Sequence, residues 1–204
     1  MANAGLLMER EKITGVILAG GLGRRMGNVD KGLQMLNGRT LIAHVSARLR
    51  PQVDELLINA NRNGDDYAAT GYRVIPDQIP DFAGPLAGLH AALVSAKHPL
   101  VATAPCDSPF LPLDLVSRLF FALTAADGDI AVARTFSQTH PVFCLCRSNL
   151  LPHLTAFLSC GERKFGLWTA SLACIEVSFD DQAEAFENIN TRDELGRFEK
   201  SAQT

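Results

Sequence analysis

A strongly apolar run that ends abruptly in glycines and cations is the feature that most constrains how this chain can fold. Residues 13–18 contain the β-branched side chains typical of a buried strand. Residues 20–31 follow directly and contain four glycines together with Arg24, Arg25 and Lys31. Glycines let backbone N–H groups approach an anion closely, and successive amides can form an anion-binding nest. The stretch therefore predicts a phosphate-binding turn; a generic turn with solvated arginines is the plainer alternative.

The spacing of this loop excludes two common phosphate-binding patterns. A P-loop would need Gly-x-x-x-x-Gly-Lys-Ser/Thr, and a dinucleotide fingerprint starting at Gly21 would need glycine where Met26 stands. The pattern that fits is Leu18-Ala19-Gly20-Gly21, then Arg24-Arg25-Met26-Gly27, then Asp30-Lys31. It resembles the glycine-rich signature of nucleotidyltransferases that activate sugars, alcohols and cofactors with a nucleoside triphosphate. The Gly-Gly pair, the double arginine and the Asp-Lys ending resemble the MobA family, the molybdenum cofactor guanylyltransferases.

Alternating strand and helix signals predict an α/β chain: a single three-layer α/β/α domain with a mostly parallel, Rossmann-like sheet. We expect this domain, of the nucleotide-diphospho-sugar transferase type, to span residues 13–204, with residues 1–12 as an N-terminal extension. The expected strands cover residues 13–18, 56–61, 72–75, 100–104, 129–133, 141–145 and 175–179. The expected helices cover residues 40–49, 65–70, 85–93, 113–125, 150–158, 162–168 and 192–198, with Thr40 as the cap of the first.

Composition narrows the classes of partner. A net charge of −3 and a pI of about 5.9 argue against general binding to nucleic acid or to an anionic membrane surface. Residues 1–12 lack the basic start and long apolar core of a secretory signal, and no run reaches the length of a membrane span. The odd number of cysteines, five, favours reduced thiols. We therefore expect a cytoplasmic protein, and a monomer.

Asp107 is the candidate metal ligand. It follows the apolar run 100–104 and lies between Pro105 and Pro109, where its carboxylate could present oxygen to a divalent cation. Its alternative role is to cap a helix that starts near Pro112 or to form an Asx turn.

Three segments are candidates for holding a second substrate. Residues 134–140 read as a polar connection where an acceptor could lie, and Arg163 and Lys164 offer cations in a block that resembles the family's Gly-Glu-Arg-Arg. Asn188 and Asn190 match the family's N-x-N-T pattern, which the resemblance assigns to the pterin substrate. The simpler explanation of Arg163 and Lys164 is a solvated helix start. That of Asn188 and Asn190 is a strand-to-helix turn.

The resemblance implies a Mg²⁺-dependent enzyme that transfers GMP from GTP to the terminal phosphate of molybdopterin, with or without bound molybdenum, and releases pyrophosphate. The residues that match GTP-contacting positions are Leu18, Ala19, Gly20, Gly21, Arg24, Lys31, Asn59, Asp77 and Asp107. Arg25, Lys31 and Asp107 take the catalytic roles, and Gly84, Pro85 and Gly88 resemble a segment that closes over the nucleotide. Molybdenum-insertion proteins and recipient molybdoenzymes or their chaperones are the implied protein partners.

Three other functions compete with this one. Cytidylyl-transferring relatives typically carry L-A-A-G where this chain has Leu18-Ala19-Gly20-Gly21, so the glycine pair favours guanine. Sugar-phosphate nucleotidyltransferases are usually longer. A non-catalytic nucleotide sensor would tend to lose Arg25, Lys31 or Asp107, all of which are present.

Overall fold

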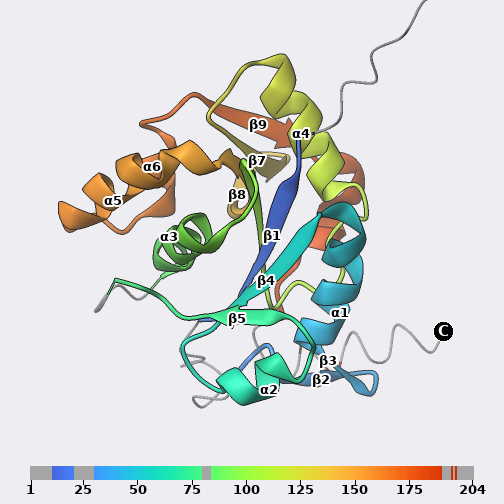
Figure 1. The fold of residues 1–204 in the computed structure, drawn as a ribbon. Helices are drawn as coiled ribbons and strands as arrows, with labels where there is room; N and C mark the ends of the chain where they lie inside the picture. The colour runs from blue at the N-terminus through green and yellow to red at the C-terminus, as the bar shows by residue number, and fades with distance from the viewer. Residues whose placement is uncertain (1–10, 21–29, 80–83, 190–193, 195, 197–204) are drawn as a thin grey trace, which may run out of the picture.

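A seven-stranded sheet forms the centre of the computed structural model, which describes residues 11–20, 30–79, 84–189, 194 and 196 (Figure 1). Its strands lie in the order β5-β4-β1-β6-β8-β7-β9. All the pairings are parallel except the two made by β8. The sheet strands are β1 (Ile13–Leu18), β4 (Glu55–Asn59), β5 (Arg73–Ile75), β6 (Leu100–Pro105), β7 (Ile130–Thr135), β8 (Gln138–Arg147) and β9 (Cys174–Ser178).

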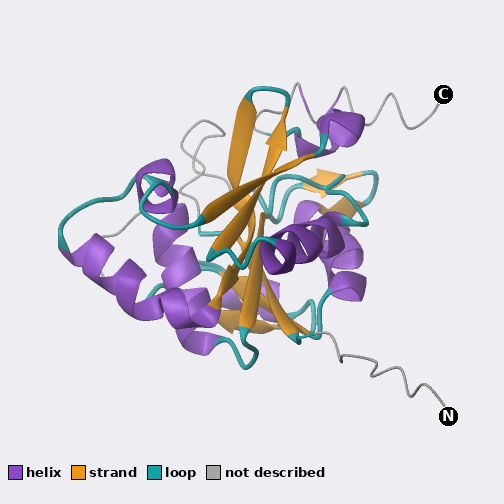
Figure 2. Ribbon diagram, turned by 90° about the horizontal axis from the view of Figure 1, so that it is seen from above, coloured by secondary structure: helices purple, strands orange, loops and turns teal. Residues whose placement is uncertain are grey.

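Helices cover both faces of the sheet (Figures 1 and 2). The helices are α1 (Leu41–Leu49), α2 (Gly64–Ala68), α3 (Pro85–Ser95), α4 (Leu115–Ala125), α5 (Leu151–Ser159) and α6 (Phe165–Thr169), with 3-10 turns at Arg50–Gln52, Ser148–Leu150 and Asp180–Phe186. Apolar residues of α1, α2 and α4 pack with Ile13 and Ile17 on one face. Those of α3, α5 and α6 pack with Val16 on the other. This alternation along β1 confirms the predicted three-layer α/β/α arrangement.

Local sequence explains how several elements begin. Thr40 caps α1 by accepting a hydrogen bond from the Ala43 N–H at 3.4 Å, as predicted. Pro85 stands in the first turn of α3, where its fixed φ suits a helix start. Asn37 and Gly38, both with positive φ, form the turn between the two-residue strands β2 (Met35–Leu36) and β3 (Arg39–Thr40).

Two expectations about elements are wrong, and one element was not expected. Residues 134–140 are no open connection: β7 and β8 form a tight hairpin in which Thr135 pairs with Gln138. The helix expected from Glu162 starts at Phe165, and residues 180–186 form a 3-10 segment that the sequence pattern did not indicate. Among the described residues, no helix combines the length and apolar content needed to cross a bilayer.

Candidate functional site

The carboxyl ends of four parallel strands come into line at one edge of the sheet. Leu18 of β1 pairs with Asn59 of β4 on one side and with Pro105 of β6 on the other, and Asn59 pairs with Ile75 of β5. The segments that leave these strands carry most of the residues singled out from the sequence. In an open parallel sheet, this edge is where ligands bind.

Lys31 and Asp107 form an ion pair at this edge. Lys31 Nζ lies 2.9 Å from Asp107 Oδ2, although the residues are separated by 76 positions in sequence. The Asp107 side chain is 13% exposed and that of Lys31 22%, so the pair is largely buried but still reaches solvent. A pair in this setting is electrostatically stronger than one in bulk water. The predicted catalytic lysine and the predicted metal ligand therefore lie in direct contact.

Cys106 precedes Asp107 in the chain, but its thiol is not a candidate reactive group. The residue is buried, and burial, with the nearby charges of Asp107 and Asp30, raises the pKa of its thiol well above the ordinary value. A thiol held neutral in this way is a poor nucleophile. Cys106 is thus a packing residue of the site.

Amide and carboxylate groups gather where β4 and β5 end. Asn59, which is 2% exposed, donates to Asp77 Oδ1 at 2.9 Å, and Asn61 donates to Asp77 Oδ2 at 2.7 Å. The Asn61 Oδ1 atom in turn accepts a hydrogen bond from the Asp77 N–H at 2.8 Å. The cluster is fixed internally, and each Asp77 oxygen retains a lone pair for a further donor.

Two glycines bring backbone close to Asn59. A Cβ atom added at Gly88 of α3 would lie 2.5 Å from Asn59 Oδ1, and one added at Gly20 would lie 3.5 Å from it. Ala19, between β1 and Gly20, donates its N–H to the Asn59 carbonyl at 2.8 Å. The predicted positions Leu18, Ala19, Gly20, Asn59 and Asp77 therefore form one contiguous surface beside the start of α3.

Asn188 is connected to the other flank of the ion pair. Ser108 donates from Oγ to Asn188 Oδ1 at 2.6 Å, and the Ile189 N–H donates to the Asp107 carbonyl at 2.8 Å. These two hydrogen bonds fix the segment around Asn188 relative to Asp107. Ser108 was not predicted to have this role, because the contact joins residues 80 positions apart.

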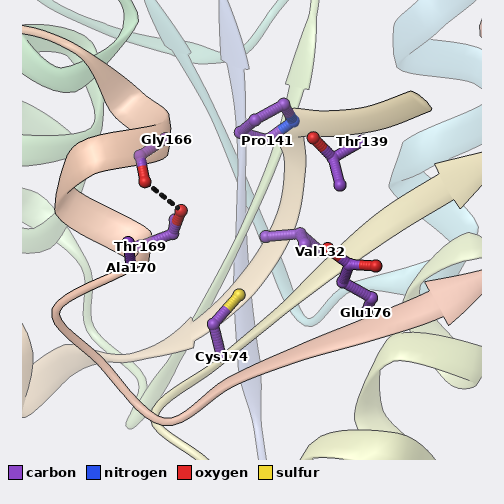
Figure 3. A pocket seen from close by; sticks show the side chains of 8 residues that line it. All are labelled: Val132, Thr139, Pro141, Gly166, Thr169, Ala170, Cys174 and Glu176. Carbon is purple, nitrogen blue, oxygen red and sulfur yellow. Dashed lines mark hydrogen bonds between the residues drawn. The ribbon is translucent and has the colours of Figure 1, made fainter. Parts of the chain in front are cut away.

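A groove of about 250 Å³ lies farther along the sheet, between α6 and the strands β7, β8 and β9 (Figure 3). Its lining comprises Val132, Thr139, Pro141, Gly166, Thr169, Ala170, Cys174 and Glu176. Arg163 and Lys164, both exposed, immediately precede α6. Burial raises the pKa of the Cys174 thiol to about 11, so the groove is lined by a neutral thiol, hydroxyls and one carboxylate.

Some of the predicted site residues lie outside the described part of the chain. These are Gly21, Arg24, Arg25 and Asn190. In contrast, Tyr67 and Asn63 contact the site through Asp30 and were missed. The only signal for them was their position in the segment that follows β4, which is too general to identify a role.

The described residues suit a bound phosphate ester and a divalent cation held jointly with it. They include no group of three or more His, Cys, Asp or Glu side chains placed to enclose a metal. Mg²⁺ commonly binds through one or two carboxylates, with water and substrate phosphates completing its shell. The Asp107 carboxylate fits that habit, and the adjacent Lys31 ammonium supplies a second positive charge for phosphate oxygens.

Comparison with known proteins identifies the family of this chain. Residues 15–171 match the model of the MobA-like NTP transferase domain. A molybdenum cofactor guanylyltransferase from Bordetella petrii is 51% identical over 193 residues, covering 93% of this chain and 98% of that protein. One from Cupriavidus necator is 53% identical over 194 residues, covering 93% and 97%.

Solved structures share the fold. Molybdopterin-guanine dinucleotide biosynthesis protein A from Archaeoglobus fulgidus superimposes with a TM-score of 0.78 at 24% identity, covering 93% of this chain and 98% of that one. A 4-diphosphocytidyl-2C-methyl-D-erythritol synthase from Anaerococcus prevotii gives a TM-score of 0.75 at 12% identity, with both chains fully covered. These two structures therefore share the fold of this chain. By its match over residues 15–171 and its identity to full-length relatives, the chain belongs to the MobA-like NTP transferase family.

Proposed function

We propose that this protein transfers GMP from GTP to the terminal phosphate of molybdopterin, forming a guanine dinucleotide cofactor and pyrophosphate. The Lys31–Asp107 pair, set where the four parallel strands end, carries this proposal in the structure. The names of relatives that are half identical over nearly their whole length support the choice of substrates. We also propose that residues 13–204 act as one domain and as a monomer in the cytoplasm.

The nucleotide is proposed to lie over the β5-β4-β1 side of the edge. Guanine presents N1–H and N2–H donors, and the acceptors available to them are the Asp77 carboxylate and the carbonyl groups near Leu18 and Asn59. The triphosphate would then extend toward Lys31, with Gly20, Gly21, Arg24 and Arg25 as further contacts. In this arrangement Lys31 stabilises charge on the α-phosphate, and Arg24 and Arg25 stabilise it on the leaving pyrophosphate.

The acceptor is proposed to approach from the opposite side of Asp107, over β8 and β7. Asn188 is held by Ser108 next to Asp107, and the groove beside α6, farther along the sheet, offers about 250 Å³. Asn190, Arg163 and Lys164 are the remaining proposed contacts to molybdopterin. An oxygen of its terminal phosphate would attack the α-phosphorus as the bond to the pyrophosphate oxygen breaks, so that no protein nucleophile is needed.

The residues present fit Mg²⁺, and we propose Asp107 as its protein ligand. Bound there with the triphosphate, the cation would supply charge neutralisation and alignment of phosphate oxygens. Because Lys31 contacts the Asp107 carboxylate, it is well placed to contact the phosphates that this cation would bind.

The test is pyrophosphate release from GTP, CTP, ATP and UTP, each with Mg²⁺ and molybdopterin. Release with GTP alone is expected. Release with CTP alone would place the protein with the cytidylyl-transferring relatives. Tight GTP binding without turnover would favour a nucleotide sensor and contradict the proposal.

A further inference from the structure

Asp30 is the residue next to Lys31, and both oxygens of its carboxylate accept hydrogen bonds from residues other than Lys31 and Asp107. Its Oδ1 accepts hydrogen bonds from the Tyr67 hydroxyl and from the Gly32 N–H at 3.2 Å. Its Oδ2 accepts one from Asn63 Nδ2 at 2.9 Å, and its carbonyl accepts one from Gln34 Nε2 at 3.1 Å. Asp30 is therefore an anchor, whereas Lys31, one residue on, extends to Asp107.

Tyr67 provides the buried part of this anchor. The whole residue is 0% exposed and belongs to the short helix α2, which packs in the same core as β1 and α1. The chain at Gly32 fits closely against it, because a Cβ atom there would lie 2.5 Å from the Tyr67 hydroxyl oxygen. Burial raises the pKa of Tyr67 well above its ordinary value, so the hydroxyl remains a donor to Asp30 at any working pH.

The helix α2 begins three residues after Asn61 of the Asn59–Asn61–Asp77 cluster. Asn63, with φ of 51°, occupies the N-cap position of α2 two residues after Asn61, and its side chain makes no capping hydrogen bond. The segment 59–67 thus touches the proposed base site at one end and Asp30 at the other.

We infer that Tyr67 and Asn63 are positioning residues that hold Lys31 against Asp107 through Asp30, so that the exit of β4 fixes both the base site and the catalytic lysine. This inference rests on the proposed function for its effect on turnover, but its geometric content can be tested without turnover. Loss of the Tyr67 hydroxyl leaves Asp30 with a weaker anchor and lets Lys31 leave the 2.9 Å contact.

The first experiment measures how fast the Lys31 amine is acylated by a small amine-reactive ester, quantified by peptide mass spectrometry on the intact protein. A lysine held in an ion pair reacts slowly. Tyr67→Phe is expected to raise the Lys31 rate several-fold while leaving the rate at Lys97 unchanged; an unchanged Lys31 rate would overturn the inference. This readout stays informative even if no guanylyl transfer is found.

The matched control is Tyr72→Phe. Tyr72 is the only other tyrosine, and it is partly buried against the same core. Among the described residues its hydroxyl makes no hydrogen bond. The change removes the same atom, so the Lys31 rate should equal that of the wild type. Asn63→Gly is a second variant: it deletes the other anchor from an exposed position and tolerates the positive φ, so it should fold even if Tyr67→Phe does not.

The second experiment is a double-mutant cycle on turnover. Tyr67→Phe is expected to lower kcat by about 10-fold to 100-fold, the range typical of a displaced catalytic group, with a smaller change in KM for GTP. In a Lys31→Ala background the same change should have little further effect, because the group that it positions is gone. A full, additive loss in both backgrounds would show that Tyr67 acts by another route. If the wild type shows no turnover at all, the proposed function fails, while the acylation result still decides the inference.

Discussion

The position of the Asn59 side chain depends on the missing Cβ of Gly88. Asn59 is buried, and its side-chain Nδ2 donates a hydrogen bond to Asp77. Its Oδ1 lies so close to Gly88 of α3 that an added Cβ atom would be 2.5 Å away. Leu18 Cδ2 would lie 3.0 Å from the same added Cβ atom, so neither neighbour has free space on that side. Glycine at position 88 is thus required by the packing of the site and not by the helix, because alanine is the better helix former.

Gly88→Ala tests this dependence. The added methyl group should displace Asn59 and weaken GTP binding, raising the Kd for GTP by about 10-fold or more. Overpacking of this kind also costs about 1–3 kcal/mol of stability. Binding is measured by titration calorimetry and stability by denaturant unfolding. Gly64→Ala is the control, because a Cβ at Gly64 meets nothing within 4 Å. Equal GTP affinity in both variants would contradict this role for Gly88.

His90 gives a second prediction at the residue scale. It is 7% exposed between α3 and α5, where Nε2 lies 3.0 Å from Thr155 Oγ1 and Nδ1 is buried with no hydrogen-bond partner among the described residues. Burial lowers the pKa of His90 below its usual 6.5, opposed in part by the charge of Asp77. The folded state therefore keeps the imidazole neutral under conditions where the unfolded state already binds a proton.

The stability contributed by this neutral imidazole is complete above the unfolded pKa of about 6.5, and it is lost as the pH falls from there through the lower pKa of the folded state. His90→Phe should therefore flatten the fall in unfolding free energy between pH 7 and pH 5, by at most about 1.4 kcal/mol per pH unit for one proton. Urea unfolding at several pH values measures the slope. An identical slope in variant and wild type would show that His90 does not drive the acid sensitivity.

At the scale of elements, the β7–β8 hairpin and α6 create the groove that we propose for the acceptor. The register of the hairpin shifts between Val132 and Ala133, and Pro141 lies in the stretch of β8 that this irregularity leaves out of the ladder. Val132, Thr139 and Pro141 supply one wall, and α6 supplies the other (Figure 3). The Thr169 hydroxyl donates to the Gly166 carbonyl at 3.1 Å within the helix.

Ala170→Phe tests whether the groove receives the acceptor. A ring at this position should fill part of the 250 Å³ and raise KM for molybdopterin by about 10-fold, with KM for GTP unchanged. Leu167→Phe is the control, because Leu167 is 50% exposed on the same helix and does not line the groove. If both variants keep the acceptor KM of the wild type, the acceptor does not use this groove.

At the scale of the whole molecule, strand order separates the two proposed substrates. The cluster of Asn59 and Asp77 lies on the β5-β4 side of β1, whereas the groove lies beyond β6, at β8, β7 and β9. Asp107, at the end of β6, stands between them, which is where a bond between nucleotide and acceptor would form.

Much of this architecture could be predicted because it depends on local patterns. The apolar runs predict the strands β1 and β6, and Thr40 predicts the start of α1, from neighbouring residues alone. The hairpin at residues 135–138 was missed because Phe136, whose φ is 51°, is not a residue type that signals a turn. Nor could local patterns show that Tyr67 hydrogen-bonds Asp30 or that Ser108 hydrogen-bonds Asn188, because such contacts exist only once the sheet has assembled.

The most direct measurement follows the fate of the α-phosphate. GTP labelled at the α-phosphate is incubated with Mg²⁺, molybdopterin and the intact chain, or its Asp107→Ala variant with the fold checked by circular dichroism. The label is expected in a molybdopterin guanine dinucleotide, in amounts equal to the pyrophosphate released, and the variant is expected to form none. Label recovered only in free GMP or unchanged GTP, or a dinucleotide made equally well by the variant, would contradict guanylyl transfer at this site.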